Sequence, residues 1–152
     1  ALCPFVVPLS CITASFAQNF NVFYKNLHIV TNNCLNYYIY WDYYHSTIDW
    51  YDSMIERHYE LGNDISFAGG SWNWLGFAPL NRKAFDNSKQ GLISARNHKV
   101  EKMYLTAWGD NGNECARGAI IPTMVLYAES YNNGSIDDEL ISKRLEQLTN
   151  AV

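Results

Sequence analysis

Beyond residue 37, short apolar runs alternate with longer amphipathic runs along the chain. The runs at 38–43, 65–68 and 100–106 are rich in aromatic and β-branched residues and have the length of strands. Gly69-Gly70 follows the second run and lets the backbone approach a neighbouring group closely. We therefore expect three strands in this part of the chain.

The longer runs carry apolar residues at helical spacing. The first continues to Tyr59; Ser46 or Thr47 can cap its start, and Gly62 supplies a stop. Pro122 is expected to kink a later run or to mark its first turn. The other expected helices are one capped by Asp86 or Asn87 that ends at His98, a long run to about Tyr131, and a last one from Ser135 or Ile136 toward Asn150.

Strands that alternate with helices predict an α/β fold with a parallel sheet and right-handed crossovers. The polar clusters that follow the strands then fall on one edge of that sheet, as in a (β/α)8 barrel. A full barrel needs roughly 250 residues, and this chain has 152. We therefore expect residues 38–152 to form the C-terminal strands and helices of a partial TIM barrel.

Residues 1–37 depart from this pattern. They are rich in Asn, Phe, Tyr and Cys, carry Lys25 as their only charged residue apart from histidine, and lack clear helix or strand periodicity. We expect an irregular N-terminal segment, and one hypothesis is that it was read out of frame. An alternative for residues 1–20 is the core of a signal peptide, although the basic n-region is missing. Pro4 and Pro8 count against a membrane-spanning helix.

Charge and cysteine usage narrow the range of partners. The net charge is −4 and no basic stripe is present, which disfavours nucleic acid. The four cysteines show neither CxxC nor zinc-like spacing and fit a reducing, cytoplasmic compartment slightly better than an oxidising one. His45 follows Asp42 by three residues, but no second histidine is near, so we expect neither a metal nor a cofactor.

Aromatic rings and polar groups gather after each expected strand. Thr106-Ala-Trp108-Gly-Asp110 continues to Glu114, and it places an indole and two carboxylates at one strand end. Tyr40-Trp-Asp42-Tyr-Tyr-His45 has the same chemistry. In parallel α/β folds ligands bind at this edge. An indole face suits the C–H face of a sugar ring, and carboxylates grip hydroxyls, so the pattern indicates a carbohydrate ligand.

Each cluster also has a structural interpretation. Trp72 and Trp74 alternate, so in an extended segment both face the same side, either as an aromatic wall or as packing of the loop. Asp110 and Glu114 could cap the helix that comes after them. The acidic run at 137–139 opens a helix, where carboxylates are favoured by the dipole.

These motifs resemble those of the family 20 glycoside hydrolases, the β-N-acetylhexosaminidases, in the branch that includes hexosaminidase D. The matching stretches are Tyr40 to His45, Phe67-Ala-Gly-Gly-Ser-Trp-Asn-Trp-Leu-Gly-Phe-Ala-Pro79 and Thr106 to Cys115, and the resemblance covers about residues 38–132. It implies an exo-acting enzyme that removes terminal N-acetylhexosamine from glycans. The acetamide oxygen of the substrate attacks the anomeric carbon, one of the exceptions to the two-carboxylate scheme.

The resemblance also implies roles for individual residues. Trp108 corresponds to the pocket ring that stacks on the sugar, and Asp110 to the acid that holds outer hydroxyls, with Glu114 assisting. Tyr40 would contact the acetamide and Asp42 a hydroxyl, unless Tyr43 or Tyr44 is the inward-facing ring. The expected substrate-binding residues are Tyr40, Trp41, Asp42, Tyr43, Trp72, Trp74, Trp108, Asp110 and Glu114.

One departure from the family is large. Its catalytic pair, an adjacent Asp that orients the acetamide and a Glu that protonates the leaving group, belongs to an earlier strand and has no counterpart here. No catalytic residue is therefore assigned, and the chain is expected to be inactive alone and to self-associate. Two alternatives stay open: a non-catalytic sugar-binding module, and a different glycosidase that pairs Asp42 with Asp110 or Glu114.

Overall fold

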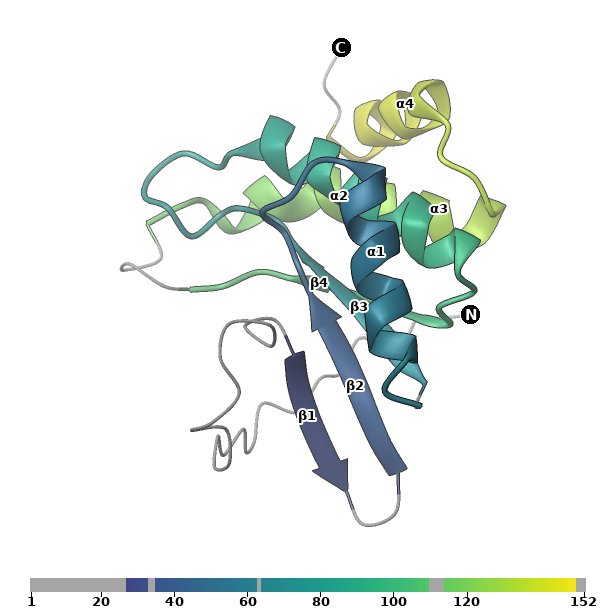
Figure 1. The fold of residues 1–152 in the computed structure, drawn as a ribbon. Helices are drawn as coiled ribbons and strands as arrows, with labels where there is room; N and C mark the ends of the chain where they lie inside the picture. The colour runs from purple at the N-terminus through teal and green to yellow at the C-terminus, as the bar shows by residue number, and fades with distance from the viewer. Residues whose placement is uncertain (1–26, 33–34, 63, 110–113, 150–152) are drawn as a thin grey trace.

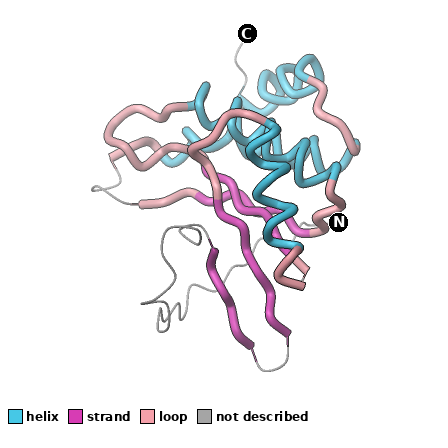
Figure 2. The backbone as a smooth tube through the Cα atoms, in the orientation of Figure 1, coloured by secondary structure: helices cyan, strands magenta, loops and turns pink. Residues whose placement is uncertain are grey.

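The computed structural model describes residues 27–32, 35–62, 64–109 and 114–149. Within them, helices pack on one face of a four-stranded sheet whose spatial order is β1-β2-β3-β4 (Figures 1 and 2). The elements, in chain order, are β1 (Leu27–Asn32), β2 (Leu35–Trp41), α1 (Ile48–Tyr59), β3 (Ile65–Gly70), α2 (Asn81–Asn97), β4 (Lys102–Thr106), the 3-10 turn η2 (Arg117–Ile120), α3 (Ile121–Asn133) and α4 (Asp138–Thr149).

The three expected strands are present as β2, β3 and β4, and they pair in parallel as predicted. The register aligns Tyr40 with Phe67 and Phe67 with Met103, so these three side chains share one face of the sheet. Their neighbours on that face come from α1, α2 and α3, and α4 packs in turn against α3. The α/β class with a parallel sheet is therefore confirmed, and its helices cover a single face.

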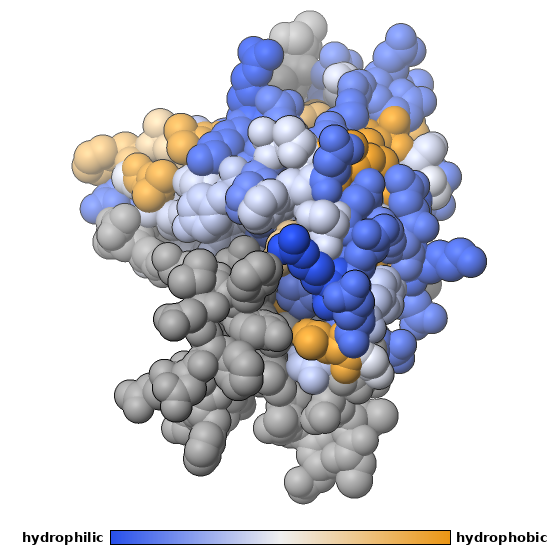
Figure 3. Space-filling model, in the orientation of Figure 1, coloured by the Kyte–Doolittle hydropathy of each residue, from blue (hydrophilic) through white to orange (hydrophobic). Residues whose placement is uncertain are grey.

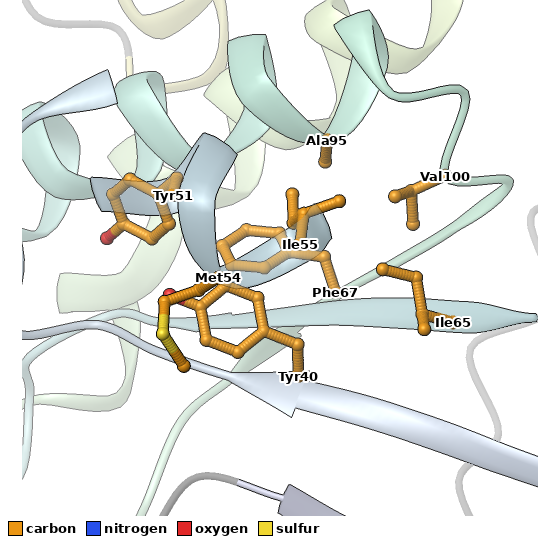
Figure 4. Close-up of a cluster of buried hydrophobic side chains, with 8 residues drawn as sticks. All are labelled: Tyr40, Tyr51, Met54, Ile55, Ile65, Phe67, Ala95 and Val100. Atoms are coloured by element: carbon orange, nitrogen blue, oxygen red, sulfur yellow. The ribbon is translucent and has the colours of Figure 1, made fainter. Parts of the chain in front are cut away.

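The core of this two-layer arrangement is aromatic. Tyr40, Tyr51 and Phe67 are fully buried between β2, β3 and α1, and the Tyr51 and Phe67 rings meet edge to face at 5.7 Å (Figure 4). The helix α2 approaches this core closely at Gly91, where a Cβ would collide with the Phe67 ring. A glycine within a helix is thus explained by packing rather than by backbone conformation.

The strand β1 was not expected from the sequence. It pairs antiparallel with β2 along Leu27–Asn32, and β2 itself begins at Leu35, so the expected boundary at residue 37 falls inside a strand. The description of residues 1–37 as lacking strand structure is therefore wrong for this part. Residues 1–26, with the signal-peptide hypothesis, lie outside the described residues.

Some helix boundaries were predicted correctly, and the start of α2 was not. The helix α2 begins at Asn81 after Leu80, not at Asp86 or Asn87, and no side chain caps it. Pro122 lies in the first turn of α3, one of the two positions expected for it. The acidic run opens α4 as predicted, because Asp137 accepts hydrogen bonds from the backbone N–H groups of Glu139 and Leu140.

Among the described residues, no helix combines the length and the apolar character that crossing a bilayer requires.

Candidate functional site

The carboxyl ends of β2, β3 and β4 are joined side by side. The backbone N–H of Asp42 donates to the Ala68 carbonyl at 3.1 Å, and that of Ser71 donates to the Thr106 carbonyl at 2.9 Å. These two bonds continue the sheet just beyond the last ladder pairs. The three aromatic–polar clusters predicted from the sequence therefore meet at one edge, as expected.

At the end of β2, the Asp42 carboxylate is buried and surrounded by donors. Its Oδ2 accepts from the Tyr40 hydroxyl at 2.8 Å and from the Trp50 indole at 3.0 Å. His45 Nδ1 lies 2.6 Å from the same oxygen. Its Oδ1 accepts from the backbone N–H groups of Tyr44 at 2.9 Å and His45 at 3.3 Å. Five contacts within the chain thus occupy both oxygens.

This arrangement changes what Tyr40 and Asp42 can do. Tyr40 is fully buried on the helix side of the sheet, packed against Phe67 and the His58 ring. Burial, followed by the neighbouring Asp42 carboxylate, raises the pKa of the Tyr40 hydroxyl. Both side chains hold β2 to the start of α1, and neither faces open solvent. The polar groups of both side chains are used in internal hydrogen bonds. Neither is therefore available in this structure for the sugar contacts that the resemblance implies.

His45 is fixed by its neighbours. Its ring stacks on the Trp50 indole with centroids 3.9 Å apart and planes 17° from parallel. The Tyr51 hydroxyl donates to the His45 backbone carbonyl at 2.7 Å, which ties the β2–α1 loop to α1. Among the described residues, no group of three or more His, Cys, Asp and Glu side chains has the geometry of a metal site.

At the end of β3, Trp72 and Trp74 lie side by side, although the segment is not extended as the prediction from their alternation assumed. Their rings stack with centroids 5.1 Å apart, and both are buried, with 4% and 6% of their surfaces exposed. Lys83 covers the Trp72 ring at 3.6 Å from its centroid. Both rings pack with Tyr43, Trp108 and Ala84, so the packing interpretation of this pair describes the structure as it stands.

Trp72 has a left-handed backbone conformation, with φ of 51°. A bulky residue rarely adopts this conformation, which disfavours it by about 1–2 kcal/mol. The Trp72 indole N–H donates to the Tyr43 carbonyl at 2.6 Å, and Asn87 from α2 donates to the same carbonyl at 2.8 Å. Burial and these bonds hold the strained turn at the edge of the sheet.

Polar side chains between the tryptophans connect β3 to β4. The Ser71 hydroxyl donates to Asn73 Oδ1 at 2.6 Å and lies 3.1 Å from the Thr106 carbonyl oxygen. The amide of Asn73 donates to the Trp108 carbonyl at 3.4 Å. Neither Ser71 nor Asn73 was assigned a role from the sequence, although their alternation with the two tryptophans places them on the other side of the segment.

At the end of β4, Trp108 meets Trp41. The two rings are edge to face with centroids 5.5 Å apart. Trp41 comes after Tyr40 in β2 and therefore points to the face of the sheet that the helices leave uncovered. The Trp108 indole N–H is buried and has no acceptor among the described residues. A buried donor without a partner is destabilising by about 1–3 kcal/mol unless a ligand or water supplies one.

Of the two carboxylates expected at this strand end, Glu114 is exposed, and Cys115 beside it is buried. Asp110 lies outside the described residues. The structure thus brings Trp41 and Trp108 together at one edge, while Tyr40, Asp42, Trp72 and Trp74 support that edge from within. Comparison of the sequence with protein-family models and with curated proteins found no match.

Proposed function

We propose that this chain is part of an exo-acting β-N-acetylhexosaminidase, and that β2 and the elements after it form the C-terminal strands and helices of its partial (β/α)8 barrel. Support comes from the topology. Three consecutive parallel strands lie in chain order, and their helices cover one face only. Repetition of such units curves a sheet into a barrel, with the uncovered face inside and ligands at the carboxyl ends of the strands.

The observation that carries the proposal is the Trp41–Trp108 pair. It lies at the carboxyl edge, where Trp41 points to the face of the sheet opposite the described helices, and the two indoles are held near right angles. One ring can stack on the C–H face of a pyranose while the other bounds its rim. The unpaired Trp108 N–H is a donor for a sugar oxygen. Glu114, and Asp110 by the family resemblance, would bind outer hydroxyls.

Asp42 is not available as the acid catalyst at this edge. Asp42 is enclosed by donors and has no free oxygen with which to protonate a leaving group. No adjacent Asp-Glu pair follows a strand as in the family, because the one such pair in the sequence, Asp138-Glu139, lies in the first turn of α4. Since positioned proton transfer contributes about 10²–10⁴-fold to rate, the chain alone is proposed to bind sugar without hydrolysing it.

Titration of the purified chain with N-acetylglucosamine and its β-1,4-linked disaccharide, followed by calorimetry, tests the proposal. We expect millimolar binding, loss of at least tenfold in affinity in Trp108→Ala, and no release of nitrophenol from a nitrophenyl N-acetylglucosaminide. Tyr131→Ala is the matched control, because that ring is 75% exposed at the far end of α3. Equal affinities in the wild type and Trp108→Ala would refute the site.

A non-catalytic carbohydrate-binding module is the second candidate, favoured by the internal engagement of Asp42. The oligomeric state separates the two. A barrel fragment exposes unpaired surface, and the loop after β3 already presents Leu75, Phe77 and Leu80, with Phe77 84% exposed (Figure 3). Self-association in sedimentation experiments supports the fragment, whereas a compact, sugar-binding monomer supports the module.

A further inference from the structure

A cavity of about 260 Å³ lies between the second half of α2 and the connection from α3 to α4. The helix α2 begins near the carboxyl end of β3, so its second half lies toward the opposite edge of the sheet from Trp108. The volume is just below the roughly 300–1,000 Å³ of sites for drug-sized ligands. The cavity therefore has room for a small molecule only.

Its walls divide into an apolar part and a cationic part. Leu92 and Ile93 of α2 and Ile136 before α4 form the apolar part, and Leu92 is almost completely buried. Arg96 of α2 and Ser130 of α3 are among the polar lining residues. The combination of hydrocarbon walls with one guanidinium favours a ligand that has an anionic head and a short aliphatic chain.

Arg96 has one satisfied nitrogen and one unsatisfied nitrogen. Its Nη2 donates to the Ser130 carbonyl and lies 3.2 Å from the Ser130 hydroxyl oxygen. Its Nη1 is buried and has no hydrogen-bond partner among the described residues. Gly134 lies beside Nη1, since a Cβ at that glycine would be 3.8 Å from it, at van der Waals distance. A buried charged donor without a partner is strongly unfavourable unless an acceptor completes it.

The charges around the cavity leave Arg96 uncompensated. Lys89 lines the same cavity, but Asp138 neutralises it, with both carboxylate oxygens 2.7–2.8 Å from Nζ. No ion pair joins Arg96 to a carboxylate within the described part of the chain. The net charge of the lining is therefore positive and concentrated on Arg96.

We propose that this cavity binds a small organic carboxylate, with the carboxylate on Arg96 Nη1 and a short aliphatic chain against Leu92, Ile93 and Ile136. A carboxylate is favoured over inorganic phosphate because the walls beyond the guanidinium are hydrocarbon. Phosphate needs donors from several groups around it, and here the one unsatisfied buried nitrogen among the described lining residues is Arg96 Nη1. The site is independent of the sugar edge, so loss of one leaves the other intact.

Sodium butyrate is the probe, with sodium chloride and sodium phosphate at matched ionic strength as references. We expect butyrate to raise the thermal midpoint of the full chain by a few degrees beyond chloride at about a hundredfold excess over its dissociation constant. Phosphate is expected to match chloride. Backbone amide shifts should change at residues 92–97 and 134–136 and stay constant at 106–109.

Arg96→Met should lose the butyrate increment, and Arg82→Met should keep it, because Arg82 is almost fully exposed on the same helix. Arg96→Met also removes the contact with Ser130 and can therefore lower the thermal midpoint without any ligand. For this reason each variant is judged by the rise in its own midpoint in butyrate relative to chloride. Ile93→Phe fills the cavity while retaining Arg96, and should also lose the increment. A wild-type midpoint equal in butyrate and chloride, an increment that survives Arg96→Met, or an equal response to phosphate would overturn the proposal.

Discussion

The ends of β2 and β4 carry the same residue types and use them differently. At the end of β2, Trp41 is followed by Asp42, whose oxygens are filled by five contacts from within the chain. At the end of β4, Trp108 presents an indole N–H without a partner among the described residues, and Glu114 nearby is exposed. The β2 end is closed, in the sense that contacts within the chain occupy both Asp42 oxygens. The β4 end keeps an indole N–H and a carboxylate without hydrogen-bond partners among the described residues.

The difference comes from the segment after each strand. The chain after β2 turns at once into α1, whose first residues include Trp50 and Tyr51, and these reach back to the loop. After β4, a longer segment separates Thr106 from Arg117 in η2, and none of its described residues folds back onto the Trp108 N–H. In this chain the aromatic–acid motif after β2 is used by the next helix, whereas the Trp108 N–H after β4 is not.

Replacing Asp42 with Ala should have the largest effect, because it leaves the buried Tyr40 hydroxyl and the Trp50 indole N–H without an acceptor. We expect a loss of about 3–5 kcal/mol in the free energy of unfolding, measured with urea. Asp49→Ala, an exposed acid in the first turn of α1, is the control and should lose under about 1 kcal/mol. A loss of that small size in Asp42→Ala would mean that the β2 end is not closed.

Replacing Ser71 with Ala should have a smaller effect, centred on the β4 end. The hydroxyl bonds to Asn73 and lies within reach of the Thr106 carbonyl, so its removal should lower the free energy of unfolding by about 1–2 kcal/mol. Because Asn73 holds the Trp108 backbone, sugar affinity should fall as well. Ser53→Ala on the exposed side of α1 is a matched control. Unchanged affinity would show that Trp108 is positioned without this bridge.

Lowering the pH should reduce the free energy of unfolding through protonation of His58, whose ring packs against Tyr40 beside the β2 end. Burial lowers the pKa of this imidazole, although the contact with the Met54 carbonyl, 2.6 Å away, opposes the shift. The unfolded chain therefore binds a proton at higher pH than the folded one, so stability falls as pH drops below about 6.5. Urea midpoints between pH 8 and 5 measure this slope, and His58→Gln should flatten it. His98→Gln, at a partly exposed site, should leave the His58 contribution in place.

Replacing Glu114 with Gln should change stability least, within about 0.5 kcal/mol, because the side chain is exposed and makes no hydrogen bond or ion pair with another described residue. Its expected effect is on ligand affinity alone, measured with the same sugar titration. Glu101→Gln, also exposed and next to β4, should alter neither quantity. A clear loss of stability in Glu114→Gln would assign that carboxylate to the capping role considered from the sequence.

Local patterns in the sequence predicted the three parallel strands, the helix α1 and the place of Pro122 in the first turn of a helix. They also predicted that the rings of Trp72 and Trp74 lie together. They failed where a partner distant in the sequence decides the structure. Strand β1 has no period of its own and forms by pairing with β2. The cap of α2 is Leu80, six residues before the nearer of the two expected caps, and the Leu80 backbone N–H donates to the Trp72 carbonyl at 3.0 Å.

In the candidate site, too, local features were predicted, and features that depend on residues distant in the sequence were not. Strand order brought the three clusters to one edge, as the sequence predicted. The saturation of Asp42 could not be read from spacing, since it depends on Trp50 reaching across from α1. The burial of Trp72 likewise depends on Lys83 and Ala84 of α2. Only the alternation of Ser71 and Asn73 with the tryptophans was available in the sequence and went unused.

The stacked pair of Trp72 and Trp74 also gives the molecule an optical property. Two indoles 5.1 Å apart and 25° from parallel couple their electronic transitions, which makes their circular dichroism depend on their mutual orientation. Because this pair lies in the same cluster as Trp108, spectra of the aromatic bands would follow the order of the ligand edge directly, without a label.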